Sequence, residues 1–309
     1  MHPSRSGPDL AIVGAARSGT SLLAAHLAAH PQISASAVKE PNYFSRHLDK
    51  GPEWYESFFP PRSDDDYRLD ASVSYTYPQY PQAIERLVEA SPSVFMIYVV
   101  RDPIPRAVSH YQFYRHYFER EQAPDFGSAL ARDSYYTDVS DYRRWLEVLG
   151  HAVPAQQLLV VPFGLLTASS HAVAEVVCAR LGIAPPAAEI EKEATLHQNN
   201  VVTFRSDRVR RVTRSLRHSR LYPVVRRTVG ADRLRRIRSA VTSVPETPTL
   251  EASLASCTSD QLAELEKLRI TADEAVEHWL RDQDQRLSLD WSQHWHSTSG
   301  PGGAAAPPA

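Results

Sequence analysis

The sequence predicts an α/β fold of three layers, in which helices flank a mostly parallel central sheet. Three uninterrupted apolar runs, at residues 10–13, 94–100 and 158–161, are typical of buried parallel strands. Segments with helical spacing of apolar residues separate these runs. A tight turn with glycine at both ends, residues 14–19, joins the first run to a helix. Strands that alternate with helices favour a parallel sheet with right-handed crossovers.

The elements follow in order along the chain. Residues 1–8 are expected to be a disordered lead-in, and a strand–turn–helix unit occupies residues 9–30 and ends before Pro31. Beyond it the sequence predicts strands at 33–38 and 67–72, a loop at 46–66 with a short helix near 53–58, and helices at 83–90, 105–119, 142–149, 172–181 and 259–280.

The bulk composition excludes several classes of protein. The 309 residues carry a net charge of −2, which gives no sign of a nucleic-acid partner. Cys178 and Cys257 are far apart, which predicts two free thiols in a reducing compartment. The first residues lack the apolar core of a signal peptide, and no apolar run is long enough to span a bilayer. We expect a cytoplasmic location.

The domain organisation shows one shift in composition. A single domain is expected over residues 9–295, with a disordered tail at 296–309. Between Arg205 and Arg238 there are 13 arginines and two acidic residues, a local charge of +11. Interleaved apolar residues predict a basic helical lid or insertion over residues 205–250. It would close over an anionic ligand, contact a membrane surface or an acidic acceptor, or form a solvated face.

The glycine turn has the chemistry of a phosphate loop. Gly14 and Gly19 have P-loop spacing, and the amides of residues 17–21 with the following helix N-terminus suit a phosphate. Thr20 replaces the usual lysine, and Arg17 lies inside the turn instead. The fold is therefore P-loop-like, but a kinase or NTPase is disfavoured, because those enzymes use the lysine on the β- and γ-phosphates. The functionless alternative is a tight strand–helix connection.

A second candidate site follows the run at residues 94–100. Arg101 stands at the end of this predicted strand, and Ser109 lies eight residues later. A helix that starts between Pro103 and Pro105 places Ser109 about one turn inside it. The two side chains would hold one phosphate at the carboxyl end of a strand, where open α/β sheets bind ligands. Taken alone, Arg101 is equally consistent with a surface salt bridge.

Together these motifs resemble the sulfotransferases that use 3′-phosphoadenosine 5′-phosphosulfate (PAPS). GAARSGTSLL resembles their 5′-phosphosulfate loop, and FMIYVVRDPIPRAVSHY resembles their 3′-phosphate motif. KEPNYF resembles the KEPHFF-type segment of heparan sulfate and related bacterial sulfotransferases, and DASVSY stands where they have a TPxY-like or SPSY-like loop. The resemblance covers residues 9–185. The chain departs from the pattern at Arg17, where lysine is commonest, at Val73, which replaces proline, and at residues 162–164, which lack an acid. It shows no clear adenine-binding loop.

The resemblance implies an enzyme that moves a sulfonate from PAPS to an acceptor hydroxyl by in-line displacement, without a metal. The acceptor would be a glycan, a glycolipid or a secondary metabolite. The alternatives are a P-loop kinase or NTPase, and a non-catalytic nucleotide- or membrane-binding protein on the same fold. The residues implied in PAPS binding are Arg17, Ser18, Gly19, Thr20, Ser21, Arg101 and Ser109.

Three residues are implied in catalysis. The resemblance places the general base at Glu40, while Arg17 would neutralise charge on the leaving oxygen and Lys39 would stabilise the sulfonate. Structural pairing of Glu40 with Lys39 is the alternative, and His110 is the rival base. The aromatic residues around Tyr111 and Phe113 are expected to pack on the sheet or to line an acceptor cleft. His294 and His296 are too few to indicate a metal site.

Overall fold

The computed structural model describes residues 7–61, 66–116, 118, 120–186 and 247–295, with the backbone of 203–204 and 242–243. At its centre lies a five-stranded sheet in the order β2-β3-β1-β4-β5, and every neighbouring pair is parallel. This sheet confirms the predicted fold class. The strands are β1 (Leu10–Gly14), β2 (Ile33–Ala35), β3 (Tyr67–Asp70), β4 (Phe95–Val100) and β5 (Leu158–Pro162), and a separate antiparallel pair joins β6 (Thr203–Phe204) to β7 (Thr242–Ser243).

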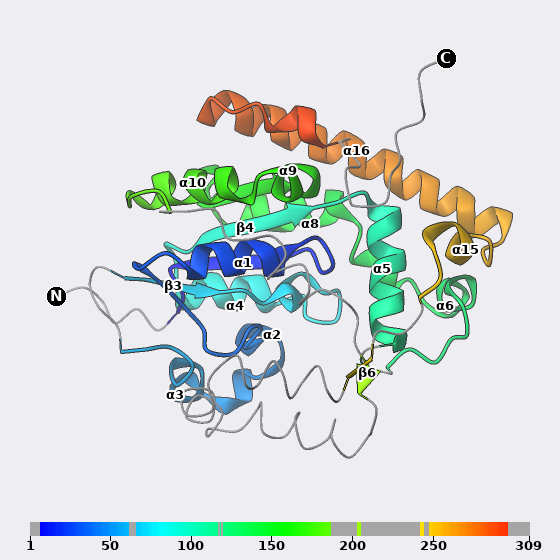
Figure 1. The fold of residues 1–309 in the computed structure, drawn as a ribbon, viewed down its shortest axis with the longest axis horizontal. Helices are drawn as coiled ribbons and strands as arrows, with labels where there is room; N and C mark the ends of the chain where they lie inside the picture. The colour runs from blue at the N-terminus through cyan, green and yellow to red at the C-terminus, as the bar shows by residue number, and fades with distance from the viewer. Residues whose placement is uncertain are drawn as a thin grey trace.

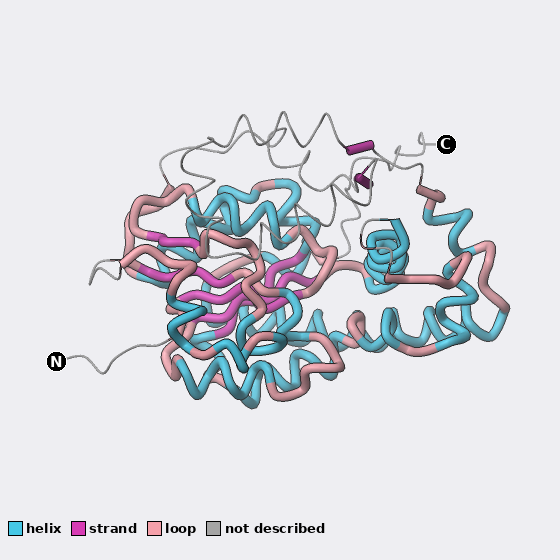
Figure 2. Tube along the Cα trace, turned by 90° about the horizontal axis from the view of Figure 1, so that it is seen from below, coloured by secondary structure: helices cyan, strands magenta, loops and turns pink. Residues whose placement is uncertain are grey.

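Helices cover both faces of the sheet (Figure 2). One face is covered by α1 (Thr20–Ala28), α9 (Phe163–Ala168) and α10 (Ser170–Leu181), and the other by α4 (Ala83–Ala90), α8 (Tyr142–Ala152) and α16 (Ser259–Leu287). The remaining helices are α2 (Tyr43–Arg46), α3 (Pro52–Glu56), α5 (Pro103–His116), α6 (Phe126–Arg132), α7 (Tyr135–Asp138) and α15 (Leu250–Leu254), with 3₁₀ turns η1 (Leu48–Lys50), η2 (Val73–Thr76), η3 (Ala155–Gln157) and η4 (Trp291–His294).

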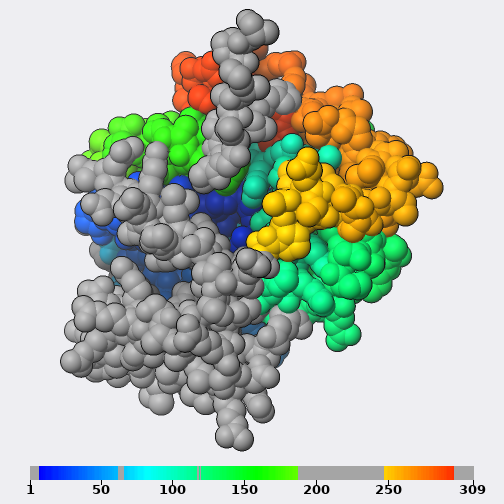
Figure 3. Space-filling view, turned by 45° about the vertical axis from the view of Figure 1, so that its right-hand side comes forward, coloured from blue at the N-terminus to red at the C-terminus, as the bar shows by residue number. Residues whose placement is uncertain are grey.

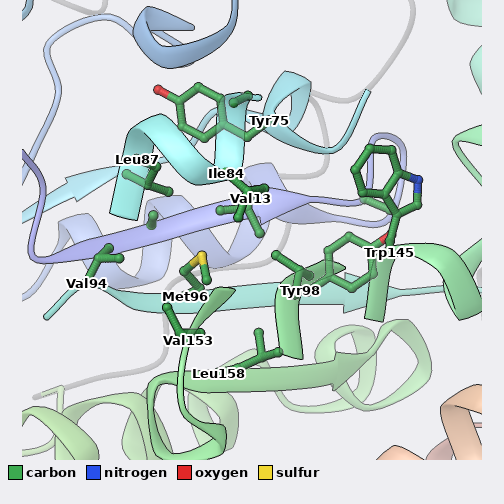
Figure 4. Packing of buried hydrophobic residues seen from close by; sticks show 14 of the residues in the cluster. Val13, Tyr75, Ile84, Leu87, Val94, Met96, Tyr98, Trp145, Val153 and Leu158 are labelled. Carbon is green, nitrogen blue, oxygen red and sulfur yellow. The ribbon is translucent and has the colours of Figure 1, made fainter. Parts of the chain in front are cut away.

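The apolar runs form strands because both of their faces are buried. Successive side chains of a strand point to opposite faces. Met96 and Tyr98 accordingly pack in the core with α8 and α16, and Ile97 packs in the core with α1 and α10. Figure 4 shows Met96 and Tyr98 on the same side of β4, next to Val13 and Leu158. A strand covered on both faces favours apolar residues at successive positions, as β1, β4 and β5 have them, whereas β3 carries the buried Arg68 and Asp70.

The strand order fixes where a ligand would bind. From β1 the chain proceeds to β2 and β3 on one side of β1, and then to β4 and β5 on the other. The chain therefore leaves β1 and β4 in opposite directions at the carboxyl edge of the sheet, a topological switch point where α/β proteins bind ligands. The turn after β1 stays next to the end of β4, because the amide of Ala15 donates to the carbonyl of Val99 at 2.9 Å.

Helix α5 leaves the sheet and builds a small core of its own. It stands beside the sheet with α6, α15 and the first half of α16 around it (Figure 1), and Figure 3 shows α15 lying directly on the α5–α6 region. Tyr111 is buried in this core against Phe126 and Tyr136. The expectation that the aromatic residues of this helix pack on the sheet is therefore wrong for Tyr111, because its partners come from α6 and α7.

Several predicted boundaries shift. Helix α5 begins at Pro103, so Ser109 lies on its second turn, and α16 continues to Leu287. The predicted loop at 46–66 contains η1 and α3. Gly7 and Pro8, assigned to the lead-in, are buried, because Gly7 lies against Ser91. The arginine-rich segment and the tail lie outside the described residues. No described helix is long and apolar enough to cross a membrane.

Candidate functional site

The turn after β1 is shaped by close contacts and by left-handed backbone. A Cβ at Gly14 would lie 2.2 Å from Thr76 Oγ1, so only glycine fits there. Gly19 has a φ of 82° and Arg17 has a φ of 68°. Both values lie in the left-handed region of the backbone, which residues other than glycine rarely adopt. A left-handed non-glycine residue costs about 1–3 kcal/mol and is commonest at functional sites. The backbone strain at Arg17 marks this turn as a candidate site.

The turn opens helix α1 with unused hydrogen-bond donors. Gly19 caps the helix without a side-chain hydrogen bond. The amides of Thr20 and Ser21 donate to no residue that the structure describes. Two free amides and the positive end of a helix dipole attract an anion. This is the arrangement that the sequence predicts for a phosphate loop.

Arg17 and the two residues of the second motif lie together, as the sequence predicts. Arg17 Nε donates to Ser109 Oγ at 3.1 Å, and Arg101 Nη1 donates to the carbonyl of Arg17 at 3.0 Å. Each guanidinium group also lies against an aromatic ring, and the sequence does not show which ring that is. Phe113 lies 4.4 Å from the Arg17 guanidinium carbon, and Phe163 lies 4.6 Å from that of Arg101. Each ring orients its guanidinium by a cation–π contact.

The electrostatics of these arginines fit an anionic ligand. Burial and the nearby Arg101 lower the pKa of Arg17 to about 10, and burial, with Arg106 nearby, lowers the pKa of Arg101. No ion pair joins Arg17, Arg101 or Arg106 to a described carboxylate. Positive charges gathered without a direct ion pair repel each other, and a bound anion stabilises them. Together with the free amides of the turn, they fit a ligand with several phosphate-like groups.

Arg106, on α5, stabilises the turn after β1, and the sequence did not reveal this role. It is completely buried, and its guanidinium donates to the carbonyls of Ala16 and Tyr136 at 3.3 and 2.6 Å and to Ser140 Oγ at 2.6 Å. Burial lowers its pKa. Arg106 and His110 are four residues apart and therefore share one face of the helix, but this spacing does not reveal the carbonyl partners of Arg106.

His110 is poorly suited to the role of rival base. It is completely buried, and burial with the neighbouring Arg106 holds the pKa of its imidazole well below the usual value. Its Nδ1 lies 3.2 Å from Arg106 Nη1, and a guanidinium always donates, so the imidazole proton is assigned to Nε2. A ring with Nδ1 engaged and Nε2 protonated has no free site to accept a proton from an acceptor hydroxyl.

Glu40 lies at the same edge of the sheet, beyond β2. Its φ is 61°, although a residue before proline prefers extended backbone. About a third of its side chain is exposed, and Oε1 accepts a hydrogen bond from Lys39 Nζ at 2.5 Å. Its charge acts on Arg17 across the site. The ion pair that the sequence raises as an alternative is thus present, and no residue that the structure describes donates to Glu40 Oε2.

An aromatic wall beside Arg17 was also missed by sequence reasoning. Arg46 lies over the rings of Tyr77 and Tyr80, at 5.9 and 5.6 Å, and shares a hydrogen bond with Tyr114. Tyr77 is buried and interacts electrostatically with both Arg17 and Glu40. These side chains come from α2, from the segment after η2 and from α5, which are far apart in the sequence. Through Tyr77, the wall lies within electrostatic range of the candidate base Glu40.

A metal would find little to bind here. Within the described residues, no cluster of three or more His, Cys, Asp and Glu side chains is arranged to hold one. His296 lies outside the described residues, so the pair with His294 is untested.

Comparison with known families gives a match over most of the chain. The family described as "Sulfotransferase domain" matches residues 7–220. Among curated proteins, the chain is 30% identical over 118 residues to a membrane-associated sulfotransferase, kil1, of Dictyostelium discoideum, covering 38% of this chain and 25% of that protein. It is 34% identical over 108 residues to human heparan sulfate glucosamine 3-O-sulfotransferase 3B1, covering 35% of this chain and 27% of that protein. The chain thus spans about a quarter of the length of these relatives.

Among solved structures, the chain is similar to a sulfotransferase from Alicyclobacillus acidocaldarius, with a TM-score of 0.49 and 23% identity. The similarity covers 62% of this chain and 92% of that one.

Proposed function

Because the chain belongs to the sulfotransferase family, we propose that it transfers a sulfonate group from PAPS to the hydroxyl of an acceptor molecule. The observation that carries the proposal is the meeting of Arg17, Ser109 and Arg101 at the switch point of the sheet, where neither arginine forms an ion pair with a described carboxylate. PAPS carries about four negative charges near neutral pH. Members of the family use PAPS as the sulfonate donor, and this site has the charge to receive it.

Each end of the donor has a candidate set of ligands. We assign the 5′ end to Ser18, Gly19, Thr20 and Ser21, because the amides of Thr20 and Ser21 have no described acceptor and stand at the N-terminus of α1. Arg101 and Ser109 would bind the 3′ phosphate, which distinguishes PAPS from ATP. Arg17 connects the two groups through its bond to Ser109 and its carbonyl bond to Arg101.

The proposed chemistry uses side chains that face this site. The acceptor oxygen forms a bond to sulfur while the bond from sulfur to the 5′-phosphate oxygen breaks, which releases 3′,5′-ADP. Glu40 would take the proton of the acceptor hydroxyl through its open carboxylate oxygen. Arg17 would stabilise the charge that grows on the leaving oxygen, a contribution of about 3 kcal/mol for comparable donors. Lys39 holds Glu40 in place and would stabilise the transferring sulfonate.

The acceptor is a glycan or a small molecule in this proposal. Two relatives, one from human and one from mouse, are heparan sulfate glucosamine 3-O-sulfotransferases. In this chain the wall of Arg46, Tyr77, Tyr80 and Tyr114 supports an acceptor with a flat or ring-shaped apolar face, since aromatic rings pack on such faces. A membrane contact through the arginine-rich segment and a cytoplasmic location stay predictions from the sequence.

The alternative of a P-loop kinase or NTPase is not favoured. Such an enzyme needs a lysine after the second glycine, where this chain has Thr20, and an acid at a strand end for Mg²⁺. The residue that ends β4 is followed by Arg101, which binds the carbonyl of Arg17.

The experiment that tests the proposal incubates the purified chain with PAPS labelled in the sulfonate and a panel of glycan and small-molecule acceptors. Mass spectrometry then detects any acceptor that gains a sulfonate. We expect transfer that depends on PAPS and proceeds without ATP. Consumption of ATP with Mg²⁺ and no transfer from PAPS would support the kinase alternative and reject the proposal.

A further inference from the structure

A series of hydrogen bonds links the segment KEPNYF, which carries Glu40, to the segment DASVSY, which has no role in the proposed reaction. It begins at Asp70, the last residue of β3, which is completely buried. The Asp70 carboxylate accepts hydrogen bonds from Ser72 Oγ at 2.6 Å, from Tyr75 at 2.6 Å and from Tyr55 at 3.0 Å. No described cation pairs with it, so these three hydroxyl groups are its stabilising partners.

The direction of the bonds in this series is fixed. Burial raises the pKa of Asp70 to about 6, so it is ionised at neutral pH and only accepts. Ser72 must therefore give its hydroxyl proton to Asp70, which leaves its oxygen to accept the amide of Asn42 at 3.0 Å. A hydroxyl that donates to a carboxylate becomes a better acceptor, because hydrogen bonds in a chain polarise one another.

The series ends on the backbone of Glu40. Asn42 Nδ2 donates to the carbonyl of Glu40 at 2.6 Å, and Ser74 Oγ donates to Asn42 Oδ1 at 2.5 Å, which sets the orientation of the amide. Glu40 and Asn42 both have left-handed φ values, 61° and 55°, on either side of Pro41. Nothing in the local sequence favours this backbone at Glu40, so contacts from β3 and η2 must impose it.

We propose that Asp70, acting through Ser72 and Asn42, is a positioning residue that holds Glu40 in its left-handed backbone and so aims its carboxylate into the site. The inference rests on the proposed role of Glu40 as general base. Asp70 itself touches neither the donor site nor Arg17. The hydrogen bonds connect Asp70 to the backbone of Glu40, and the charge of Glu40 also helps to raise the pKa of Asp70.

The test replaces Ser72, because removal of its hydroxyl interrupts the series of hydrogen bonds and leaves the bonds from Tyr55 and Tyr75 to Asp70 intact. Ser57→Ala is the matched control, since the Ser57 hydroxyl bonds only to the carbonyl of Trp54 within α3. In crystals of Ser72→Ala we expect Glu40 to leave its left-handed φ and to lose its contact with Lys39, whereas Ser57→Ala keeps both. If Glu40 keeps its φ and its contact with Lys39 in Ser72→Ala, the inference is wrong.

Turnover gives a second, independent readout. With an acceptor that the wild-type protein sulfonates, Ser72→Ala should lower kcat about tenfold, with the Kd for 3′,5′-ADP unchanged. In a Glu40→Gln background the same substitution should have no further effect, because both act through one group. An equal loss in both backgrounds would overturn the inference. Asn42→Ala serves if Ser72→Ala does not fold.

The two proposals fail in different ways. If the wild-type protein transfers no sulfonate, the proposed function fails, but the backbone of Glu40 in the crystals still decides the positioning role. If transfer occurs and Ser72→Ala matches wild type in both readouts, only the positioning role fails.

Discussion

Arg17 donates its Nε proton to the hydroxyl of Ser109, 3.1 Å away and 92 residues later in the chain. The bond joins the turn after β1 to the helix after β4, which are neighbours only because β1 and β4 pair in the sheet. Two motifs that each suit one phosphate thereby become a single site.

Replacement of Arg17 should affect turnover more than binding. Arg17→Met removes the charge placed to stabilise the leaving oxygen, and we expect kcat to fall about 10²–10³-fold. Arg17→Lys keeps the charge but loses the fork that reaches Ser109, so its loss should be intermediate. Steady-state kinetics with PAPS measures both. Arg143→Met, at an exposed pair with Glu274 on α8, is the control. A kcat within twofold of wild type for Arg17→Met would contradict the prediction.

Replacement of Arg101 should remove the preference for a 3′ phosphate. The wild-type protein is expected to bind 3′,5′-ADP far more tightly than ADP. Arg101→Met should weaken 3′,5′-ADP about 10–100-fold, the effect of a lost charged hydrogen bond, and leave the Kd for ADP nearly unchanged. Titration calorimetry with the two nucleotides measures the difference. Equal weakening of both would show that Arg101 acts elsewhere.

Replacement of Glu40 should lower turnover without weakening the binding of the donor nucleotide. In Glu40→Gln the side chain keeps its shape but no longer takes a proton, so turnover should fall about 10²–10⁴-fold. The Kd for 3′,5′-ADP should stay within about twofold of wild type, because Glu40 faces the acceptor. Glu53→Gln, at an exposed position in α3, is the control. Full activity in Glu40→Gln would exclude it as the base.

The buried Asp70 should make stability fall as the pH rises from about 4 to 6. Burial raises its pKa from 3.8 to about 6 in the folded protein, so in this range the folded state binds more protons than the unfolded state. Two pKa units correspond to about 3 kcal/mol. The free energy of unfolding of wild type relative to Asp70→Asn should therefore be larger at pH 4.5 than at pH 7.5, measured by urea unfolding. A difference that does not change with pH would refute this.

Glu121 should stabilise the protein in the opposite pH range. Its carboxylate is buried and accepts hydrogen bonds from Arg132 and Tyr136, and the hydrogen bond from Arg132 is the main cause that lowers its pKa to about 2, against the opposing effect of burial. A lowered pKa gives stability above pH 4.5 that is lost as the pH falls toward 2. Arg132 is half exposed, so water screens the pair, and Glu121→Gln should cost about 1–3 kcal/mol at pH 7.

Chemical denaturation of Glu121→Gln at pH 7 and pH 3 measures this contribution. The loss should shrink at pH 3, where the carboxyl group of Glu121 is almost completely protonated in the unfolded state. Glu147→Gln on the outer face of α8 is expected to have little effect at either pH.

Local patterns identified much of the candidate site. The spacing of Arg101 and Ser109 survives in the structure because both stand on one continuous segment, a strand end and the helix that follows it. Arg106 was not found, because its partners are carbonyls of Ala16 and Tyr136, and a carbonyl is present at every residue and leaves no mark on the sequence. Phe113 and Phe163 were not placed for a similar reason, since an aromatic residue alone does not show which cation it faces.

The buried parallel strands, the phosphate-type turn between Gly14 and Gly19 and the family resemblance could be predicted from the sequence, because each depends on residues close together in the chain. Only the tertiary structure decided that Asp70 reaches Glu40 through Ser72 and Asn42, and that Arg46 and Tyr77 form a wall beside Arg17. These contacts join β3, α2 and the segment after η2. They exist because parallel strands bring their carboxyl ends to one edge of the sheet, and a sequence read locally does not contain that edge.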